Sequence, residues 1–218
     1  MANNYRKTIL KTILDIENWP RKEHFHFFRK FEEPFFGATV EIDCTNAYQT
    51  SKKLGASFFM YYLHKTLIAV NTIESFRYRI DGDKIVVHDK IDGSATIGRT
   101  DGSFGFSWIE YCPDFEIFTA NALLEIERVQ NTPGLFTRDF DTDNVIHFSA
   151  IPWVNFTSLS HARSYTFPDS CPKISFGKMI TNDSEKKTMS MSIHVHHGLM
   201  DGLHLGQFVD CFQELMNQ

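Results

Sequence analysis

The sequence predicts an α/β or α+β fold in which helices flank a large mixed β-sheet. Strand-like and helix-like periodicities alternate along all 218 residues, as they do when helices pack on a sheet. Hydrophobic residues make up 42% of the chain, and its 21 phenylalanines can fill a large core and apolar pockets. The sequence shows no linker, internal repeat or low-complexity stretch, so we expect residues 1–218 to form a single domain.

Strands are indicated where apolar and polar residues alternate. The clearest strand is 188–196, in which every second residue is apolar and the others are polar. Residues 76–80 and 84–88 flank the turn Asp81-Gly82-Asp83, which predicts a hairpin. Further strands are expected at 37–44, 145–150 and 173–180.

Helices are indicated where apolar residues recur every three or four positions. This spacing occurs at 57–71, and again at 115–129 after Pro113 and Asp114. The chain closes with an amphipathic stretch whose apolar stripe is Leu205, Phe208, Val209, Phe212 and Leu215. Pro20 opens a short helix at 20–25, since proline suits a first helical position.

The composition is typical of a cytoplasmic globular protein. The net charge of −5 includes no basic run, which disfavours a nucleic-acid partner. The N-terminus lacks the pattern of a secretion signal, and apolar runs are too short for a membrane-spanning helix. The four cysteines lie far apart without a CxxC pair, so we expect reduced thiols.

The segment His196-His197-Gly198-Leu199-Met200-Asp201-Gly202, at the end of the clearest strand, carries the strongest chemical signal. A histidine at a strand end is held rigidly and yet faces open space. Its unperturbed pKa of about 6.5 suits a group that takes and returns a proton within one turnover. Asp201, followed by glycine, suggests a tight turn that a charge holds in place.

Three other interpretations of these residues stay open. His197 could be packed and hydrogen-bonded without any chemical role. The three histidines His194, His196 and His197 could bind a metal, although zinc needs further ligands that the sequence does not identify. Asp201 could cap the final helix, which is compatible with a role in the turn.

HHGLMDG resembles the HHxxxDG signature of the chloramphenicol acetyltransferase family, which dihydrolipoyl acyltransferases share. Three more blocks resemble that family in the expected order: NWPRKEHF at 18–25, FSAIPWVNFTSL at 148–159 and SFGKM at 175–179. The resemblance covers essentially the whole chain. It implies the CoA-dependent acyltransferase fold, and acetyl-CoA as co-substrate with no metal.

The resemblance implies a role for each matching residue. His197 would be the general base that takes a proton from a hydroxyl of chloramphenicol, within a ternary complex with acetyl-CoA. Ser149 would stabilise the oxyanion, and Ser175 would hold an assisting water. Asp201 and Arg21 would form a structural pair that supports the turn. The aromatic residues that would bind substrate are Phe28, Phe36, Phe104 and Phe136, and Trp153 would contact CoA. The family assembles as a homotrimer with active sites between subunits.

Some positions differ from the family, so either their side chains point outward or the acceptor is more polar than chloramphenicol. Glu32 and Glu33 occupy a segment that is apolar in the family, and His161 stands where a pocket leucine is expected. The same chemistry on a different, more polar hydroxyl is therefore an alternative. A non-catalytic binding protein of this fold is another, and a dihydrolipoyl acyltransferase core a third, although the lipoyl domain of such chains is absent here.

Overall fold

The computed structural model describes residues 10–139, 143–166 and 168–218. Its strands are β1 (Lys11–Ile13), β2 (Phe35–Asp43), β3 (Tyr78–Asp81), β4 (Lys84–His88), β5 (Asp92–Gly98), β6 (Phe104–Phe106), β7 (Val145–Ala150), β8 (Lys173–Phe176), β9 (Ile180–Thr181) and β10 (Lys187–His196). Its helices are α1 (Lys22–Phe28), α2 (Thr45–Lys53), α3 (Phe58–Thr72), the 3₁₀ helix η1 (Glu74–Arg77), α4 (Phe115–Asn131) and α5 (Gly202–Met216).

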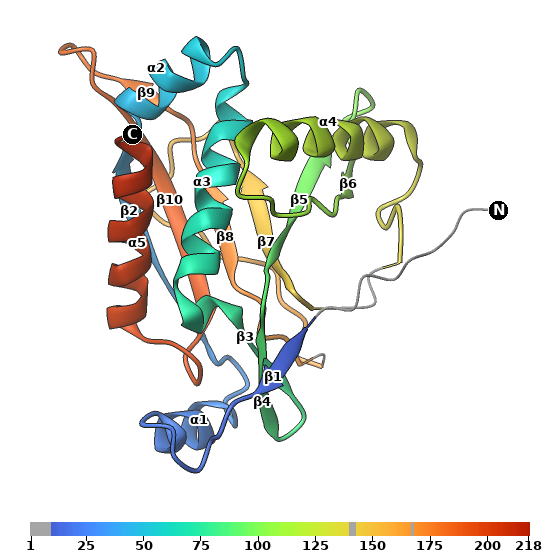
Figure 1. Cartoon of the computed structure of the whole chain (residues 1–218), viewed down its shortest axis with the longest axis vertical. Helices are drawn as coiled ribbons and strands as arrows, with labels where there is room; N and C mark the ends of the chain where they lie inside the picture. Colours follow the sequence, from blue (N-terminus) through green and yellow to red (C-terminus); the bar gives the residue numbers. More distant parts are fainter. Residues whose placement is uncertain (1–9, 140–142, 167) are drawn as a thin grey trace.

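The larger sheet is mixed, as the sequence predicts. Its strand order is β2-β10-β8-β7-β5-β6, and β9 pairs with β10. Strand β7 runs parallel to both β5 and β8, whereas β10 is antiparallel to β8 and β2. A smaller sheet, in the order β1-β4-β3, lies below it near α1 (Figure 1).

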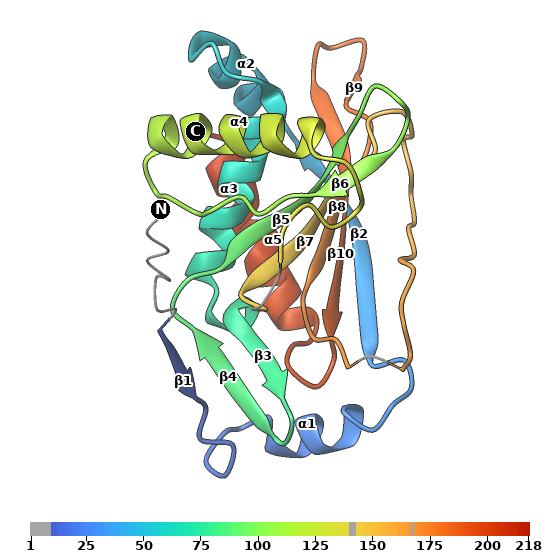
Figure 2. The same cartoon turned by 90° about the vertical axis from the view of Figure 1, so that its right-hand side faces the viewer.

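The helices α3, α4 and α5 cover one face of the larger sheet (Figures 1 and 2). Helix α3 lies against α5 and is buried along most of its length, which explains why its residues are apolar nearly all round. The apolar residues of β10 face these helices and are almost fully buried: Met189, Met191, Ile193 and Val195. This side of the sheet forms the hydrophobic core.

The opposite face of the larger sheet, here called the open face, carries no helix within the described residues. The extended segment between β7 and β8 runs along it (Figure 2). Because side chains alternate along a strand, the open face receives the polar residues of β10, among them Ser192, His194 and His196. The sheet thus buries its apolar face in the core and holds polar side chains in fixed positions on the open face.

Most of the predicted elements are confirmed, with shifted boundaries. The helix expected at 20–25 begins only at Lys22, because Pro20 lies in the preceding turn, in which Lys22 N–H donates to Trp19 O. The strand expected at 173–180 stops at Phe176, where Lys178 N–H turns away to Val154 O. Phe76 belongs to η1 rather than to the hairpin. The elements β1, α2, η1, β5, β6 and β9 were not predicted.

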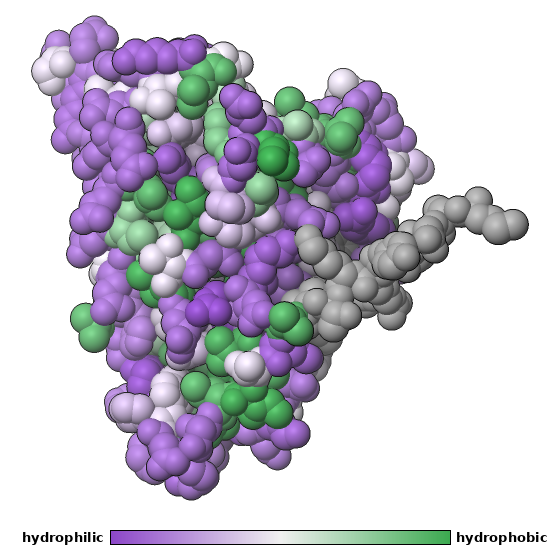
Figure 3. Space-filling model, viewed as in Figure 1, coloured by the Kyte–Doolittle hydropathy of each residue, from purple (hydrophilic) through white to green (hydrophobic). Residues whose placement is uncertain are grey.

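The helix-covered face is mainly hydrophilic at its surface, and its apolar side chains form scattered patches (Figure 3). Helices with a length and hydropathy sufficient to cross a bilayer are absent from the described residues.

Candidate active site

His197 lies directly after β10, where the strand enters the turn that leads to α5. Its backbone N–H donates to Pro34 O at 2.8 Å, which fixes the turn to the segment before β2. The imidazole stacks on Phe28, with ring centroids 3.9 Å apart and planes 10° apart. Phe36 lies 4.4 Å away on a tilted plane. Two of the four aromatic residues predicted to bind substrate therefore contact the predicted base.

The protonation pattern of His197 follows from its hydrogen bond. Its Nδ1 lies 3.2 Å from Met200 O. A carbonyl oxygen can only accept, so this bond assigns the proton to Nδ1 and leaves Nε2 as the basic nitrogen. The side chain is partly exposed, so a substrate can reach it. The ring is thus oriented as a general base requires.

Arg21 and Asp201 meet as predicted and hold the turn that carries His197. Arg21 Nη1 donates to Asp201 Oδ2, and Arg21 Nη2 donates to His197 O at 3.0 Å. The arginine is nearly buried, and its charge is compensated by this carboxylate. One guanidinium therefore connects the helix cap of α5 with the backbone of the predicted base.

Asp201 is also the N-cap of α5, so the capping interpretation is correct as well. Its Oδ1 accepts from Leu203 N–H at 3.0 Å and lies 2.8 Å from His204 Nδ1. Partial burial favours a higher pKa for Asp201, but the His204 hydrogen bond and the Arg21 charge outweigh it and hold the pKa below its usual value. The carboxylate is therefore ionised and engaged on both oxygens. No pattern in the sequence points to His204.

Ser149 and Ser175 are neighbours on the open face. The register pairs Ser149 of β7 with Ser175 of β8, and Ser175 with Ser192 of β10. The three serines form a row across three strands, here called the serine row. The Ser175 hydroxyl is fully buried and has no hydrogen-bond partner among the described residues. Ser149 is partly exposed.

The serine row and His197 do not meet within one chain. His197 lies five positions beyond Ser192, which at the usual rise of a strand is roughly 17 Å. Hydrogen-bond reach is about 3 Å. The contact between His197 and Phe36 also places the imidazole towards the helix side of the strand end, because Phe36 pairs with buried Val195. The predicted reacting groups therefore form two separate half-sites.

The remaining predicted contacts lie with the serine row or at the surface. Phe104 and Phe136 are exposed by 47% and 69%, and both contact Phe106. Because the register pairs Thr96 with Phe106, these aromatics belong to the same half-site as Ser149. Trp153 is 81% exposed in the segment after β7.

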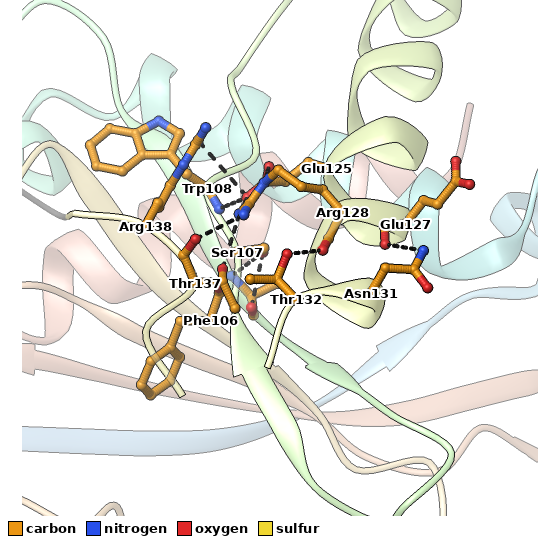
Figure 4. Close-up of polar contacts among 11 residues, drawn as sticks. Phe106, Ser107, Trp108, Glu125, Glu127, Arg128, Asn131, Thr132, Thr137 and Arg138 are labelled. Carbon is orange, nitrogen blue, oxygen red and sulfur yellow. Dashed lines mark hydrogen bonds and ion pairs between the residues drawn. The ribbon is translucent and has the colours of Figure 1, made fainter. Parts of the chain in front are cut away.

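A buried carboxylate, Glu125, holds the loop after α4 through Arg128 and Thr137 (Figure 4). Glu125 of α4 accepts two hydrogen bonds from Arg128, at 2.7 and 2.8 Å, and one from Trp108 N–H. Arg128 in turn donates to Thr137 O and Oγ1. The charge of Arg128 thus fixes the loop after α4 at Thr137, next to Phe136.

A second row on the open face was not predicted from the sequence. The register places Ser94, His147, Lys173 and His194 side by side on β5, β7, β8 and β10, one step nearer to His197 than the serine row. We call these residues the polar row. The alternation along β10 indicated that Ser192 and His194 share a face of the sheet. The neighbours of His194 on other strands follow only from the strand order. At its end lies Gly37, where a Cβ atom would come within 2.5 Å of His194.

The imidazoles of the polar row are uncharged at neutral pH. Burial, followed by the charge of Lys173, lowers the pKa of His147 to about 4, even though part of the side chain is open to solvent. His161 lies against His194 with ring centroids 4.8 Å apart. Burial and neighbouring positive charge lower the pKa of His161 to about 4 and also lower that of His194.

One group of side chains has spacing compatible with a metal. Ligand atoms of His147, Asp169 and Cys171 lie within 4.8 Å of one another. However, the ammonium of Lys173 donates to Asp169 Oδ2 and to Cys171 O, so a cation already occupies this carboxylate. The arrangement fits an ion pair better than a metal centre. His194, His196 and His197, considered above as ligands, do not form such a group.

A polar pocket of about 470 Å³ adjoins the polar row. It is lined in part by Arg29, Glu32, Arg163, Tyr165, Asp169 and His196. Its volume lies in the range of small-molecule sites. Arg163 pairs with Glu33 at 3.0 Å and stacks on the Phe35 ring. Of the two glutamates that differ from the family, Glu32 therefore lines the pocket and Glu33 is held in an ion pair beside it.

The fold and these half-sites define an acyltransferase, and the comparisons with known proteins agree. Residues 9–213 match the profile of the chloramphenicol acetyltransferase family. The protein therefore belongs to this family. Chloramphenicol acetyltransferase 3 of Escherichia coli is 29% identical over 207 residues, covering 94% of this chain and 97% of that protein. The Staphylococcus aureus chloramphenicol acetyltransferase is 30% identical and covers 94% of this chain and 95% of its own length.

Solved structures show the same fold. A chloramphenicol acetyltransferase structure superposes with a TM-score of 0.81 at 34% identity, covering 96% of this chain and 99% of the other. The dihydrolipoamide acetyltransferase of Azotobacter vinelandii superposes with a TM-score of 0.65 at 11% identity, covering 90% and 86% of the two chains. The second likeness concerns the fold alone.

Proposed function

We propose that the protein transfers an acetyl group from acetyl-CoA to a hydroxyl group, in a ternary complex, with His197 as general base. The observation that carries this proposal is the orientation of His197. Its Nδ1 is bound to Met200 O, its face is stacked on Phe28, and Nε2 is left for a substrate proton. Four free cysteines are typical of a protein in a reducing compartment, which supports a cytoplasmic enzyme.

The proposed reaction moves one proton out and back. His197 Nε2 takes the proton of the acceptor hydroxyl while the hydroxyl oxygen bonds to the carbonyl carbon of the thioester. The tetrahedral intermediate collapses, the carbon–sulfur bond breaks, and the imidazolium returns the proton to the CoA thiolate. The products are an acetyl ester and CoA. Holding both substrates together supplies much of the rate enhancement.

The serine row is proposed to stabilise the charge that forms on the carbonyl oxygen. Ser149 is partly exposed on the open face and can donate to an oxyanion. Ser175 is buried beside it with its hydroxyl unpaired among the described residues, which suits a group that binds a water molecule. A hydroxyl without a partner at such a place is costly unless something binds there.

The separation of the two half-sites supports an assembly in which subunits share each active site. Because His197 and the serine row lie roughly 17 Å apart along one chain, His197 can serve Ser149 only in a second copy. We propose the homotrimer of the family, with His197, Phe28 and Phe36 of one subunit facing Ser149 and Phe104 of its neighbour. A closed ring of heterologous contacts produces such sites.

Chloramphenicol is the first candidate acceptor, because the relatives at 29–30% identity are chloramphenicol acetyltransferases. A more polar hydroxyl acceptor is the second candidate. The polar row and the adjoining pocket favour it, because the row places imidazole and ammonium groups next to the serine row and guanidinium groups line the pocket beyond it.

CoA release from acetyl-CoA, with and without chloramphenicol, tests the proposal. We expect turnover only with an acceptor present, and His197→Ala should lose at least three orders of magnitude in kcat with an unchanged melting temperature. His24→Leu is the matched control, since His24 is exposed on α1. Near-normal turnover by His197→Ala would refute the assignment of the base.

A further inference from the structure

We propose that the preferred acceptor is an uncharged molecule with several hydroxyl groups, such as a sugar or a nucleoside, and that the polar row binds it. The inference rests on the proposed function, because it concerns the acceptor of the same site. It would make chloramphenicol a poorer substrate than a neutral polyol.

The position of the polar row brings it within reach of the acceptor. His147 and Lys173 precede Ser149 and Ser175 by two residues on the same strands, so the two rows lie about 7 Å apart on one face. A base from a neighbouring subunit that reaches Ser149 lies over this face. An acceptor held between that base and Ser149 contacts His147 when it extends about 7 Å along the strands.

The charges around the polar row are already compensated. Lys173 donates to the Asp169 carboxylate, and Arg163 pairs with Glu33 at 3.0 Å. Both cations also pack against the Phe35 ring, with Lys173 Nζ 4.8 Å from its centroid. The row thus offers hydrogen bonds without a free positive charge, which favours a neutral ligand over an anionic one.

Uncharged imidazoles match hydroxyl groups. Each neutral ring presents one donor and one acceptor, and a hydroxyl group likewise donates and accepts. His147 is exposed, so a ligand hydroxyl can reach the nitrogen atoms of its ring. An apolar aryl group over the row would leave such polar atoms unpaired and desolvated. Sites built for hydroxyl groups reject analogues that lack them.

The adjoining pocket provides room for such a molecule. Its 470 Å³ are bounded by Asp169 and Arg163, which belong to the ion pairs beside the row. Paired carboxylates and guanidinium groups around an exposed tyrosine, Tyr165, offer both hydrogen bonds and a flat surface for a sugar ring.

Two isosteric substitutions at His147 test the proposal. We would measure kcat/KM for CoA release with methyl glucoside, uridine, glycerol 3-phosphate and chloramphenicol as acceptors. The wild type should prefer methyl glucoside or uridine. His147→Leu removes both hydrogen bonds and should lower kcat/KM for the preferred polyol about tenfold, while chloramphenicol turnover stays or rises. His147→Asn keeps a donor and an acceptor and should stay within about threefold of the wild type.

Binding is measured separately by saturation-transfer NMR on the His197→Ala protein with methyl glucoside and uridine. Binding that His147→Leu abolishes supports the inference even if no alcohol is acetylated, in which case only the proposed transfer fails. The inference is overturned if neither polyol binds, if glycerol 3-phosphate or chloramphenicol is preferred, or if His147→Leu affects all acceptors equally. His24→Leu should match the wild type throughout.

Discussion

At the scale of single residues, burial keeps His196 from carrying a proton at neutral pH. His196 is only 3% exposed, and its Nδ1 accepts from Gly198 N–H at 3.1 Å. Burial first, and then the charge of Arg163, lower the pKa of His196 to about 4 from 6.5. The adjacent His197 is partly exposed at the strand end. Two neighbouring imidazoles therefore differ in burial: His196 is held inside the fold, whereas His197, the proposed base, is open to a substrate.

The depressed pKa of His196 predicts how stability depends on pH. The unfolded chain binds a proton below about pH 6.5, but the folded chain binds it only below about 4. The neutral His196 imidazole therefore contributes roughly 3 kcal/mol to the free energy of unfolding. This contribution is complete above pH 6.5 and is lost as the pH falls from 6.5 to 4. His196→Asn retains an acceptor for Gly198 but does not titrate.

Urea unfolding at fixed protein concentration, at pH 7.5 and pH 5, measures this contribution. We expect the wild type to lose about 2 kcal/mol more than His196→Asn between these two values. Equal losses in the two proteins would show that His196 does not contribute to the acid sensitivity.

At the scale of elements, the turn between β10 and α5 combines a helix cap with an ion pair. Asp201 caps α5 through Leu203 N–H and compensates the nearly buried charge of Arg21, which also binds the His197 carbonyl. Loss of the Asp201 charge should therefore displace the His197 imidazole and also lower the stability of the protein. A substitution that keeps the helix cap but removes the charge separates the capping function of Asp201 from its ion-pairing function.

Asp201→Asn keeps a good N-cap but leaves the Arg21 charge uncompensated. We expect the free energy of unfolding to fall by about 1–3 kcal/mol and kcat to fall as well. The loss of stability is smaller than for a fully buried pair, because a third of the Asp201 side chain is exposed. Asp201→Ala should cost about 1 kcal/mol more. Thermal unfolding and CoA release measure both effects.

Asp83→Asn is the control, because Asp83 is 98% exposed in its pair with Arg29 and such a pair contributes little. If Asp201→Asn melted and turned over like Asp83→Asn, the turn would not depend on this ion pair.

The elements also show what sequence can and cannot predict. The strand β10 and the helices α3 and α5 follow from periodicity, because one face of each is buried in the core. Strand β5 was missed because Asp92, Gly93 and Ser94 begin it and only Ala95 and Ile97 carry apolar side chains. The pair of Arg21 and Asp201 came from family resemblance, since 180 positions separate the two residues. The polar row depends on strand order, which no local pattern contains.

At the scale of the whole molecule, the site predicted from sequence is divided. His197 and Phe28 lie at one end of the sheet, whereas Ser149 and Phe104 lie elsewhere on the open face and its edge. Every residue of the prediction is present, but no single chain brings the reacting groups together. Assembly is therefore expected to be a condition of activity.

Mixing two inactive variants tests whether subunits share a site. His197→Ala and Ser149→Ala, refolded together in equal amounts, should regain about a quarter of the wild-type activity, because a wild-type histidine meets a wild-type serine at that fraction of interfaces. Each variant refolded alone is the control, and light scattering should give the mass of a trimer of the 25.3-kDa chain. Activity that stays at the level of the separate variants would contradict shared sites.

The close approach of Gly37 to His194 restricts how this surface can change during evolution. A Cβ atom at position 37 would lie 2.5 Å from the imidazole, which already packs against His161. A side chain at position 37 is thus tolerated only where position 194 carries a smaller residue. Homologous sequences should consequently vary at these two sites together, with an aromatic ring on β10 occurring only where β2 has glycine.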